Sequence, residues 1–258
     1  MQQVLELYRY REMIVSLVRK DLKGRYKGSV LGFLWTFLNP LLQLLVYTVV
    51  FSQIMRSGVK DYALHLFVAL VPWIFFSSAL TTGARLILDQ KNMIKKIYFP
   101  RAVLPVAYTL SSFCNMLFAF VIVFAVLLLS GRGVSLPALL YLPLVMLIQL
   151  FLVLGVNLIT ASLTVYWRDL EHMMGVLSMA LMYLTPVVYS MDLIPVQWRK
   201  FYLLNPMAPL VLAYRNILYD GMVPAASLLL RGSLSAAVLL PCGAWLFEKL
   251  QRRFAEVL

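Results

Sequence analysis

The feature that most constrains this chain is the length of its uncharged stretches. Neither residues 102–131 nor residues 133–167 contain a single Asp, Glu, Lys or Arg. About 20 apolar residues in a helix cross the roughly 30 Å hydrocarbon core of a bilayer. The whole chain is 62% hydrophobic and 13% charged, whereas soluble domains are nearer half apolar and a quarter charged. The sequence therefore predicts an all-α integral membrane protein.

Hydropathy predicts six membrane-spanning helices within one domain that covers residues 1–258. We expect them at about 33–55, 64–84, 103–129, 138–166, 172–190 and 228–247. The fourth follows from one of the two uncharged stretches, and only the short polar turn WRDLE separates it from the fifth.

Two further segments have an amphipathic pattern but are not apolar enough to span. Residues 1–30 carry an aliphatic and aromatic stripe opposite a strongly basic one, which is typical of a helix lying at a membrane surface. Such a helix could anchor the protein, contact a partner, or do both. Residues 85–99 carry a wet face that includes Asp89, Lys91, Lys95 and Lys96, and Pro100 follows them. We expect one short helix there, within a segment 85–101 that docks a soluble partner.

The distribution of basic residues predicts which side each end faces. The N-terminal segment, residues 85–101, Arg168 and the C-terminal tail together hold sixteen Lys or Arg, and the opposite side holds seven. Because positive charge is retained in the cytoplasm, both termini are predicted to be cytoplasmic. The net charge of +12 is then explained by topology and anionic lipid, and we expect no nucleic-acid partner.

The stretch QWRKFYLLNPMAPLVLAYRN, residues 197–216, is apolar in its centre but broken by Pro206 and Pro209. If it crossed the membrane, the basic tail would be placed outside. We therefore expect the wider segment 191–227 to form re-entrant helices at the extracytoplasmic face.

Several chemistries are disfavoured by what the chain lacks. None of its eleven carboxylates lies in the body of a predicted span, which argues against an ion-coupled transporter. The two histidines lie at span ends, and no metal-ligand spacing or phosphate-binding loop occurs. We expect no catalytic site, metal or cofactor on this chain, and energy supplied by a partner.

Polar and aromatic side chains recur on single faces of two spans. Trp35, Asn39, Gln43 and Tyr47 follow at steps of four, and Tyr183 and Tyr189 lie at the end of the fifth span. Polar groups are costly against lipid, so these faces should meet protein or water. They predict either hydrogen bonding between helices or a conduit with aromatic walls.

Five ordered stretches carry a resemblance that covers nearly the whole chain. They are RDLKGRYKGSVLGFLWTFLNPLLQLLVYTVVFSQIM, NMIKKIYFPRAVLP, YWRDLEH, TPVVYSMDLIP and LLNPMAPLVLAYRNILYDG. Together they resemble the membrane subunit of polysaccharide-exporting ABC transporters, the group that moves O-antigen, capsule and teichoic-acid polymers. The resemblance implies a type-2 ABC exporter permease fold in the cytoplasmic membrane of a bacterium.

The resemblance also implies partners and site positions. It implies a homodimer joined to two copies of a separate ATPase that binds ATP and Mg, and a lipid-linked polysaccharide as substrate. Coupling to the ATPase would fall on Asp89, Lys91, Lys95, Lys96, Arg168 and Asp169. An extracytoplasmic gate would fall on Phe201, Tyr202, Asn205, Pro206 and Tyr214.

Two other functions fit the same pattern of spans. One is an ABC exporter of this fold for a drug or a lipid. The other is a membrane scaffold or passive channel with no ATPase partner.

Overall fold

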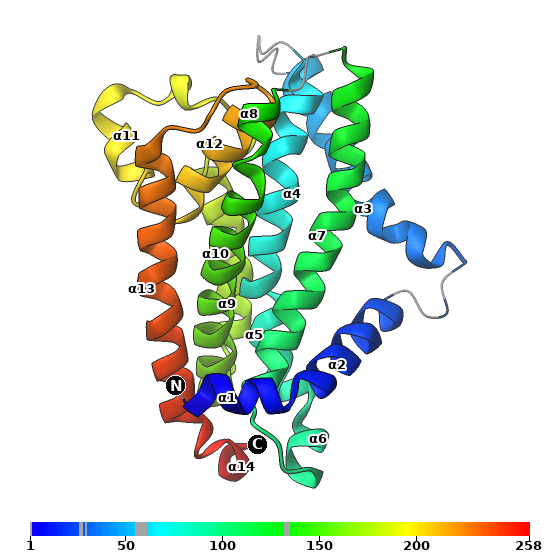
Figure 1. Ribbon diagram of the computed structural model, residues 1–258, viewed down its shortest axis with the longest axis vertical. Helices are drawn as coiled ribbons and strands as arrows, with labels where there is room; N and C mark the ends of the chain where they lie inside the picture. Colours follow the sequence, from blue (N-terminus) through cyan, green and yellow to red (C-terminus); the bar gives the residue numbers. More distant parts are fainter. Residues whose placement is uncertain (1, 26–27, 29, 55–60, 132–134) are drawn as a thin grey trace.

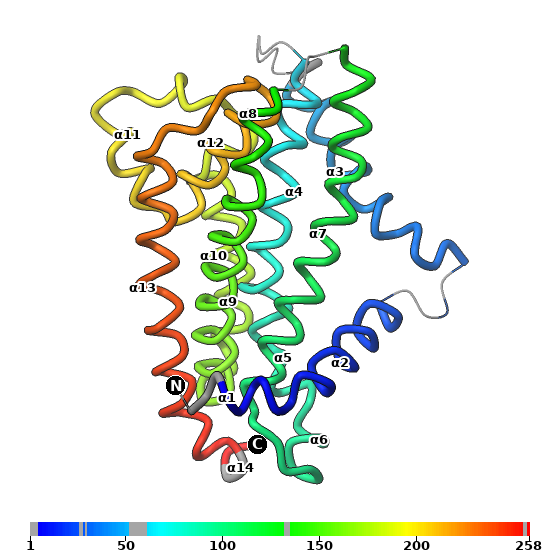
Figure 2. The backbone as a smooth tube through the Cα atoms, viewed as in Figure 1, coloured from blue at the N-terminus to red at the C-terminus, as the bar shows by residue number. Residues whose placement is uncertain are grey.

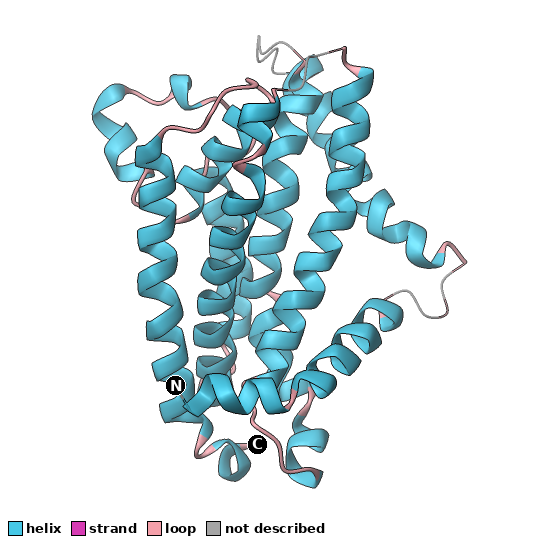
Figure 3. Ribbon diagram, viewed as in Figure 1, coloured by secondary structure: helices cyan, strands magenta, loops and turns pink. Residues whose placement is uncertain are grey.

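In a computed structural model, the described residues 2–25, 28, 30–54, 61–131 and 135–258 form an elongated helical bundle. No β-strand occurs within these ranges (Figure 3). Both chain termini lie at one end of the bundle, called here the terminal end, and the opposite end is called the distal end (Figure 1). The all-α prediction is confirmed.

Among the described residues, five helical stretches are long and apolar enough to cross a membrane. They contain α3 (Trp35–Thr48, flanked by η1 Gly32–Leu34 and η2 Val49–Ile54), α4 (Tyr62–Leu80), α7 (Val103–Leu129), α9 (Leu142–Tyr166) and α13 (Ala226–Gln251). In lipid the backbone must satisfy its own hydrogen bonds, so long apolar runs form helices. The end of the predicted first span, from residue 55, lies outside the described residues.

The sixth apolar helix, α10, is shorter than predicted. It covers Leu170–Leu184 and ends at Thr185, whose backbone is extended. At 1.5 Å per residue, α10 alone is about 22 Å long, which is less than the hydrocarbon core. Residues 185–188 continue as a buried, non-helical segment. The count of six spans therefore stays a prediction.

The N-terminal segment forms two helices where one was expected. These are α1 (Gln2–Arg9) and α2 (Arg11–Gly24), which part at Tyr10. Whereas α1 lies across the terminal end, α2 rises obliquely beside α7 (Figure 1). The N-terminal segment therefore packs along the side of the bundle through α2 and lies across its end through α1.

The expected single helix at 85–99 is also divided. Helix α5 (Thr82–Asp89) ends at Gln90, and α6 (Lys91–Lys96) begins directly after it. Gly83, Ala84 and Ile87 are buried, which fixes α5 in the bundle against α7 and α9. The expectation of one continuous helix was wrong, because α5 packs within the bundle whereas α6 projects at the terminal end (Figure 1). The docking role of the segment stays a prediction.

The distal end carries the short elements. Helix α8 (Leu136–Leu139) precedes α9, and η3 (Met191–Leu193), α11 (Val196–Tyr202) and α12 (Met207–Leu218) follow α10. Helix α12 has 12 residues, about 18 Å of rise, and so cannot cross a bilayer. The last helix, α14 (Phe254–Val257), lies at the terminal end.

Close packing of two glycines joins α9 to α13. A Cβ atom on Gly155 would lie 2.6 Å from the carbonyl carbon of Leu239, and Gly243 faces the Gly155 backbone in turn. Small residues let apolar helices approach each other closely in a membrane. The path of the backbone shows α9 and α13 running side by side along the bundle (Figure 2).

Candidate functional site

The predicted conduit residues of the first span lie on a helix that is largely exposed in the single chain. Asn39 and Gln43 are exposed, whereas Trp35 and Tyr47 are half-buried. The Tyr47 hydroxyl donates to the Met182 sulfur of α10 at 3.7 Å, so α3 and α10 lie together at this point. The exposed amides would be poorly solvated by lipid.

Helix α10 is exposed over most of its surface, and Ser178 is its one buried residue. Tyr183 is 56% exposed. The Tyr189 hydroxyl donates to the Tyr183 carbonyl oxygen at 2.6 Å and so holds the chain after α10 back against the helix. The structure therefore brings the aromatic end of α10 and the polar stripe of α3 to a common, uncovered side of the subunit; their role as a conduit stays a prediction.

The predicted coupling residues gather at the terminal end. Lys91, Lys95 and Lys96 are exposed on α6, and Arg168 and Asp169 are exposed in the turn before α10. Asp89, at the end of α5, lies 3.5 Å from the Arg85 guanidinium. The tip after α6 is apolar: Tyr98 is 96% exposed, and Ile97 is exposed beside it.

An ion pair that the sequence did not indicate links the two predicted coupling segments. Arg85 of α5 donates to the Glu171 carboxylate of α10 at 2.8 Å. This contact ties the turn at 167–169 to the end of α5 and so to the base of α6. Because both side chains are partly exposed, the pair adds little to stability, but it fixes the distance between the two segments.

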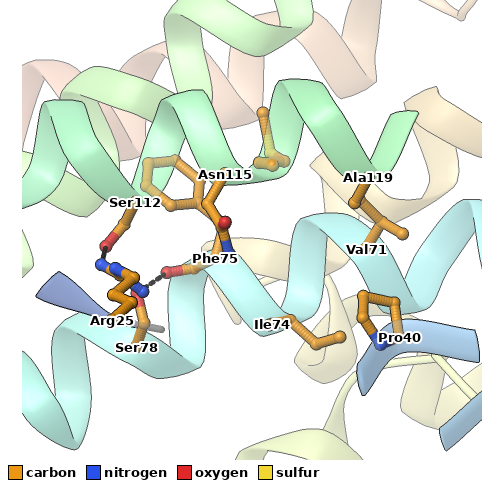
Figure 4. Close-up of a pocket in the computed structure, with 10 residues that line it drawn as sticks. Arg25, Pro40, Val71, Ile74, Phe75, Ser78, Ser112, Asn115 and Ala119 are labelled. Carbon is orange, nitrogen blue, oxygen red and sulfur yellow. Dashed lines mark hydrogen bonds between the residues drawn. The ribbon is translucent and has the colours of Figure 1, made fainter. Parts of the chain in front are cut away.

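Two charged side chains at the end of α2, Asp21 and Arg25, contact α7. Arg25 donates to the Ser112 hydroxyl at 3.1 Å (Figure 4). The same guanidinium pairs with the Asp21 carboxylate at 2.8 Å. Ser111 donates to the same Asp21 carboxylate. The two serines lie on the third predicted span, so the charges enter the bundle as a neutral, hydrogen-bonded pair.

One of the predicted gate residues, Asn205, joins the end of α10 to the start of α12. The Asn205 amide donates to the Thr185 hydroxyl at 2.8 Å, and its side-chain oxygen accepts from the Met207 backbone N–H at 3.0 Å. Asn205 therefore stabilises the start of α12, just after half-buried Pro206. Phe201 is exposed on α11, and Tyr202 is half-buried.

Tyr214 does not lie where a gate residue was expected. It is fully buried, and its hydroxyl donates to the Gln149 side-chain oxygen at 2.7 Å. The Gln149 amide in turn donates to the Pro72 carbonyl of α4 at 2.7 Å. Burying a phenol and an amide requires such partners, so Tyr214 belongs to a polar chain inside the subunit that joins α12, α9 and α4.

Arg215, near the end of the stretch 197–216, is only 3% exposed. Its guanidinium donates to the carbonyl oxygens of Val187 (2.6 Å), Tyr189 (3.0 Å) and His65 (3.4 Å). Burial lowers the pKa of Arg215 to about 10, so the side chain remains charged at neutral pH. The non-helical segment after α10 supplies carbonyls that no helix satisfies, and Arg215 occupies them.

Among the described residues, no group of three or more His, Cys, Asp or Glu side chains could hold a metal ion. The geometry consists of an uncovered polar and aromatic face, a projecting basic tip at one end and a hydrogen-bonded cap at the other.

Comparison with known proteins defines the class. Residues 12–219 match the family model described as ABC-2 type transporter. The chain therefore belongs to the ABC-2 type transporter family and is a multi-pass membrane protein.

Individual relatives cover nearly the full length. The O-antigen export system permease protein RfbA of Myxococcus xanthus is 36% identical over 98% of both chains. A protein of the same name from Klebsiella pneumoniae is 32% identical over 96% of this chain and 95% of its own length. The polysialic acid transport protein KpsM of Escherichia coli is 22% identical over 81% of this chain and 82% of its own.

Proposed function

We propose that this chain is the membrane subunit of an ATP-driven exporter of lipid-linked polysaccharide in the cytoplasmic membrane of a bacterium. The observation that carries the proposal is the 36% identity, over 98% of both chains, to an O-antigen export system permease. The lower similarity to a polysialic acid transport protein supports an activity on polysaccharides in general.

A second copy of the chain would complete the passage. Asn39, Gln43 and Tyr183 face outward from the single subunit, and such groups are retained in membranes where they meet protein or water. In a homodimer that pairs the α3–α10 sides, they would line a shared conduit. Hydroxyl-rich polymers suit a wall that combines amides with aromatic rings.

The energy would come from a separate ATPase that binds ATP and Mg and docks at the terminal end, two copies to each dimer. The basic residues of α1, α2, α6 and the tail all lie at this end, so the positive-inside rule makes it cytoplasmic. The element that projects toward an ATPase, and that it could bind, is the exposed tip formed by Lys95, Lys96, Ile97 and Tyr98. Its motion would reach α10 through Arg85 and Glu171.

Deletion of the gene, with complementation, tests the proposal. We expect surface polysaccharide to be lost and lipid-linked polymer to accumulate inside the cell, and plasmid-borne wild-type chain to reverse both. Normal surface polymer in the deletion strain, with no internal accumulation, would contradict it.

Charge reversal of Lys95 and Lys96 to Glu then tests docking. We expect polysaccharide export to fall. We also expect less ATPase to co-purify with the chain, whether or not polymer is present, while the amount of chain in the membrane is unchanged. Arg231, a basic residue at the distal end on α13, provides the control: its reversal to Glu should leave ATPase binding unchanged.

A further inference from the structure

A pocket of about 440 Å³ lies at the distal end between the start of α4, η3 and α12. This volume is within the range of roughly 300–1,000 Å³ usual for small-ligand sites. It opens beside the predicted exit and is separate from the α3 stripe.

The back of the pocket is held rigidly. Arg215, which lines it, is fixed by bonds to three carbonyl oxygens on α4 and the chain after α10. At the front, Arg199 donates to the carbonyl oxygens of Ile194 at 3.0 Å and Asp192 at 3.3 Å, which fixes η3 against α11. A pre-formed wall lowers the ordering cost of binding.

The lining groups are those that recognise hydroxyl-rich ligands. The Asp192 and Asp220 carboxylates, the Asn216 amide and the Ser190 hydroxyl line one space, and the Ser190 hydroxyl donates to the Asp192 carboxylate at 3.1 Å. The Tyr219 ring lines one wall and is backed by the buried His65 ring, with centroids 5.0 Å apart in an edge-to-face pair. Aromatic rings suit the C–H face of a pyranose, and the polar groups suit its edge.

The charges also select among polymers. Asp192 and Asp220 offset Arg215 and Arg199, whose guanidinium lies 3.9 Å from the Asp192 carboxylate, so the pocket has no excess positive charge to attract an anionic chain. An acidic sugar would find both guanidiniums already engaged, by the Asp192 carboxylate and by carbonyl oxygens, and would gain no ion pair.

We propose that this pocket binds a neutral pyranose unit of the polymer as it leaves the conduit. The inference rests on the proposed export of polysaccharide and names the sugar class that the exit accepts. On binding, each sugar unit would replace its hydrogen bonds to water by hydrogen bonds to the pocket. The net gain in free energy is small, so binding would be weak and the polymer could move on.

Cysteine protection in purified transporter complex tests the site. In a background with Cys114→Ala and Cys242→Ala, Leu212→Cys would place a thiol on the pocket wall without removing a polar group, and Met191→Cys would do so from η3. Met222→Cys, exposed and outside the pocket, is the control. The probes are the cell's own surface polymer, released by mild acid, and polysialic acid.

We expect the cell's polymer to slow maleimide labelling of Leu212→Cys and Met191→Cys at least threefold and to leave Met222→Cys unchanged. Adding Asn216→Leu should abolish the protection. Equal labelling with and without polymer at both pocket positions would overturn the proposal, as would equal protection by polysialic acid.

The deletion strain separates this result from the proposed function. If export depends on the chain but the pocket thiols are never protected, the pocket proposal fails and the exporter proposal stands. If export does not depend on the chain, both fail.

Discussion

Two apolar helix pairs of this subunit use their surfaces in opposite ways. Helices α9 and α13 meet through Gly155 and Gly243, and the outer face of α13 exposes Leu230, Leu234 and Val238. Helices α3 and α10 meet more loosely, and their outer face exposes Asn39, Gln43 and Tyr183. The first exposed face is apolar at these positions, whereas the second combines two amides and a phenol with apolar side chains such as Leu45 and Val176. These polar groups, which lipid solvates poorly, are the reason for proposing that a second copy covers the α3–α10 side.

The largest expected effect is on the close packing of α9 and α13. Gly155→Leu would drive a side chain into the Leu239 backbone, and because backbone cannot give way, we expect loss of folded protein and of export. Overpacking costs about 1–3 kcal/mol where side chains can shift, and more where they cannot. Detergent size-exclusion profiles and a thermal melt would measure it.

Gly175 on α10 is the matched control, because a Cβ there would have nothing within 4 Å. Gly175→Ala should be as abundant as wild type. If Gly155→Leu were as abundant as wild type and melted at the wild-type temperature, α9 and α13 would not depend on close packing, and the contrast with α3 and α10 would not hold.

The next effect concerns the buried chain between Tyr214, Gln149 and Pro72. Tyr214→Phe leaves the Gln149 oxygen without its donor, which costs about 1–3 kcal/mol for a buried polar group. We expect a lower melting temperature and a changed reactivity of thiols placed on α11. Tyr202→Phe, on a half-buried residue at the same end, should change the melting temperature less; the reverse order would argue against the buried chain.

The next variants exchange the polar character of the α3 face with the apolar character of the α13 face. We expect a smaller effect on stability than above but a specific effect on export. Asn39→Leu with Gln43→Leu should leave the amount of inserted protein unchanged and reduce export several-fold, since the conduit loses its hydrogen-bonding groups. Leu230→Asn with Leu234→Gln should do the opposite and lower protein abundance. Equal losses of abundance and export in both double variants would indicate that α3 is a packing helix.

The smallest expected effect on stability is at Arg85 and Glu171, where a partly exposed pair contributes about 0–1 kcal/mol. Arg85→Glu should nevertheless reduce polymer-stimulated ATP hydrolysis, because α6 and α10 would no longer move together. Arg85→Glu with Glu171→Arg should restore it. If the double variant binds the ATPase normally but does not recover polymer-stimulated ATP hydrolysis, the Arg85–Glu171 pair does not couple α6 to α10.

The sequence predicted the helical class and the positions of the long spans, because hydrophobic length alone determines them. It did not predict the break at Gln90, since the amphipathic pattern continues through it. The burial of Tyr214 and Arg215 was not predicted, for another reason. Their burial depends on Gln149 and on carbonyls at 65, 187 and 189, far away in sequence. Pro186 has no backbone N–H and cannot continue α10, and it is the local sequence signal for the non-helical segment whose carbonyls Arg215 binds.

The pairing of α2 with α7 has a consequence for synthesis. Arg25 and Asp21 meet serines that lie 87 and 90 positions further along the chain. When the first 25 residues leave the ribosome, the segment that will neutralise and cover them has not yet been made. These contacts of the N-terminal helix can therefore form only after the helix at 103–129 has been made. At this point the order of assembly differs from the order of translation.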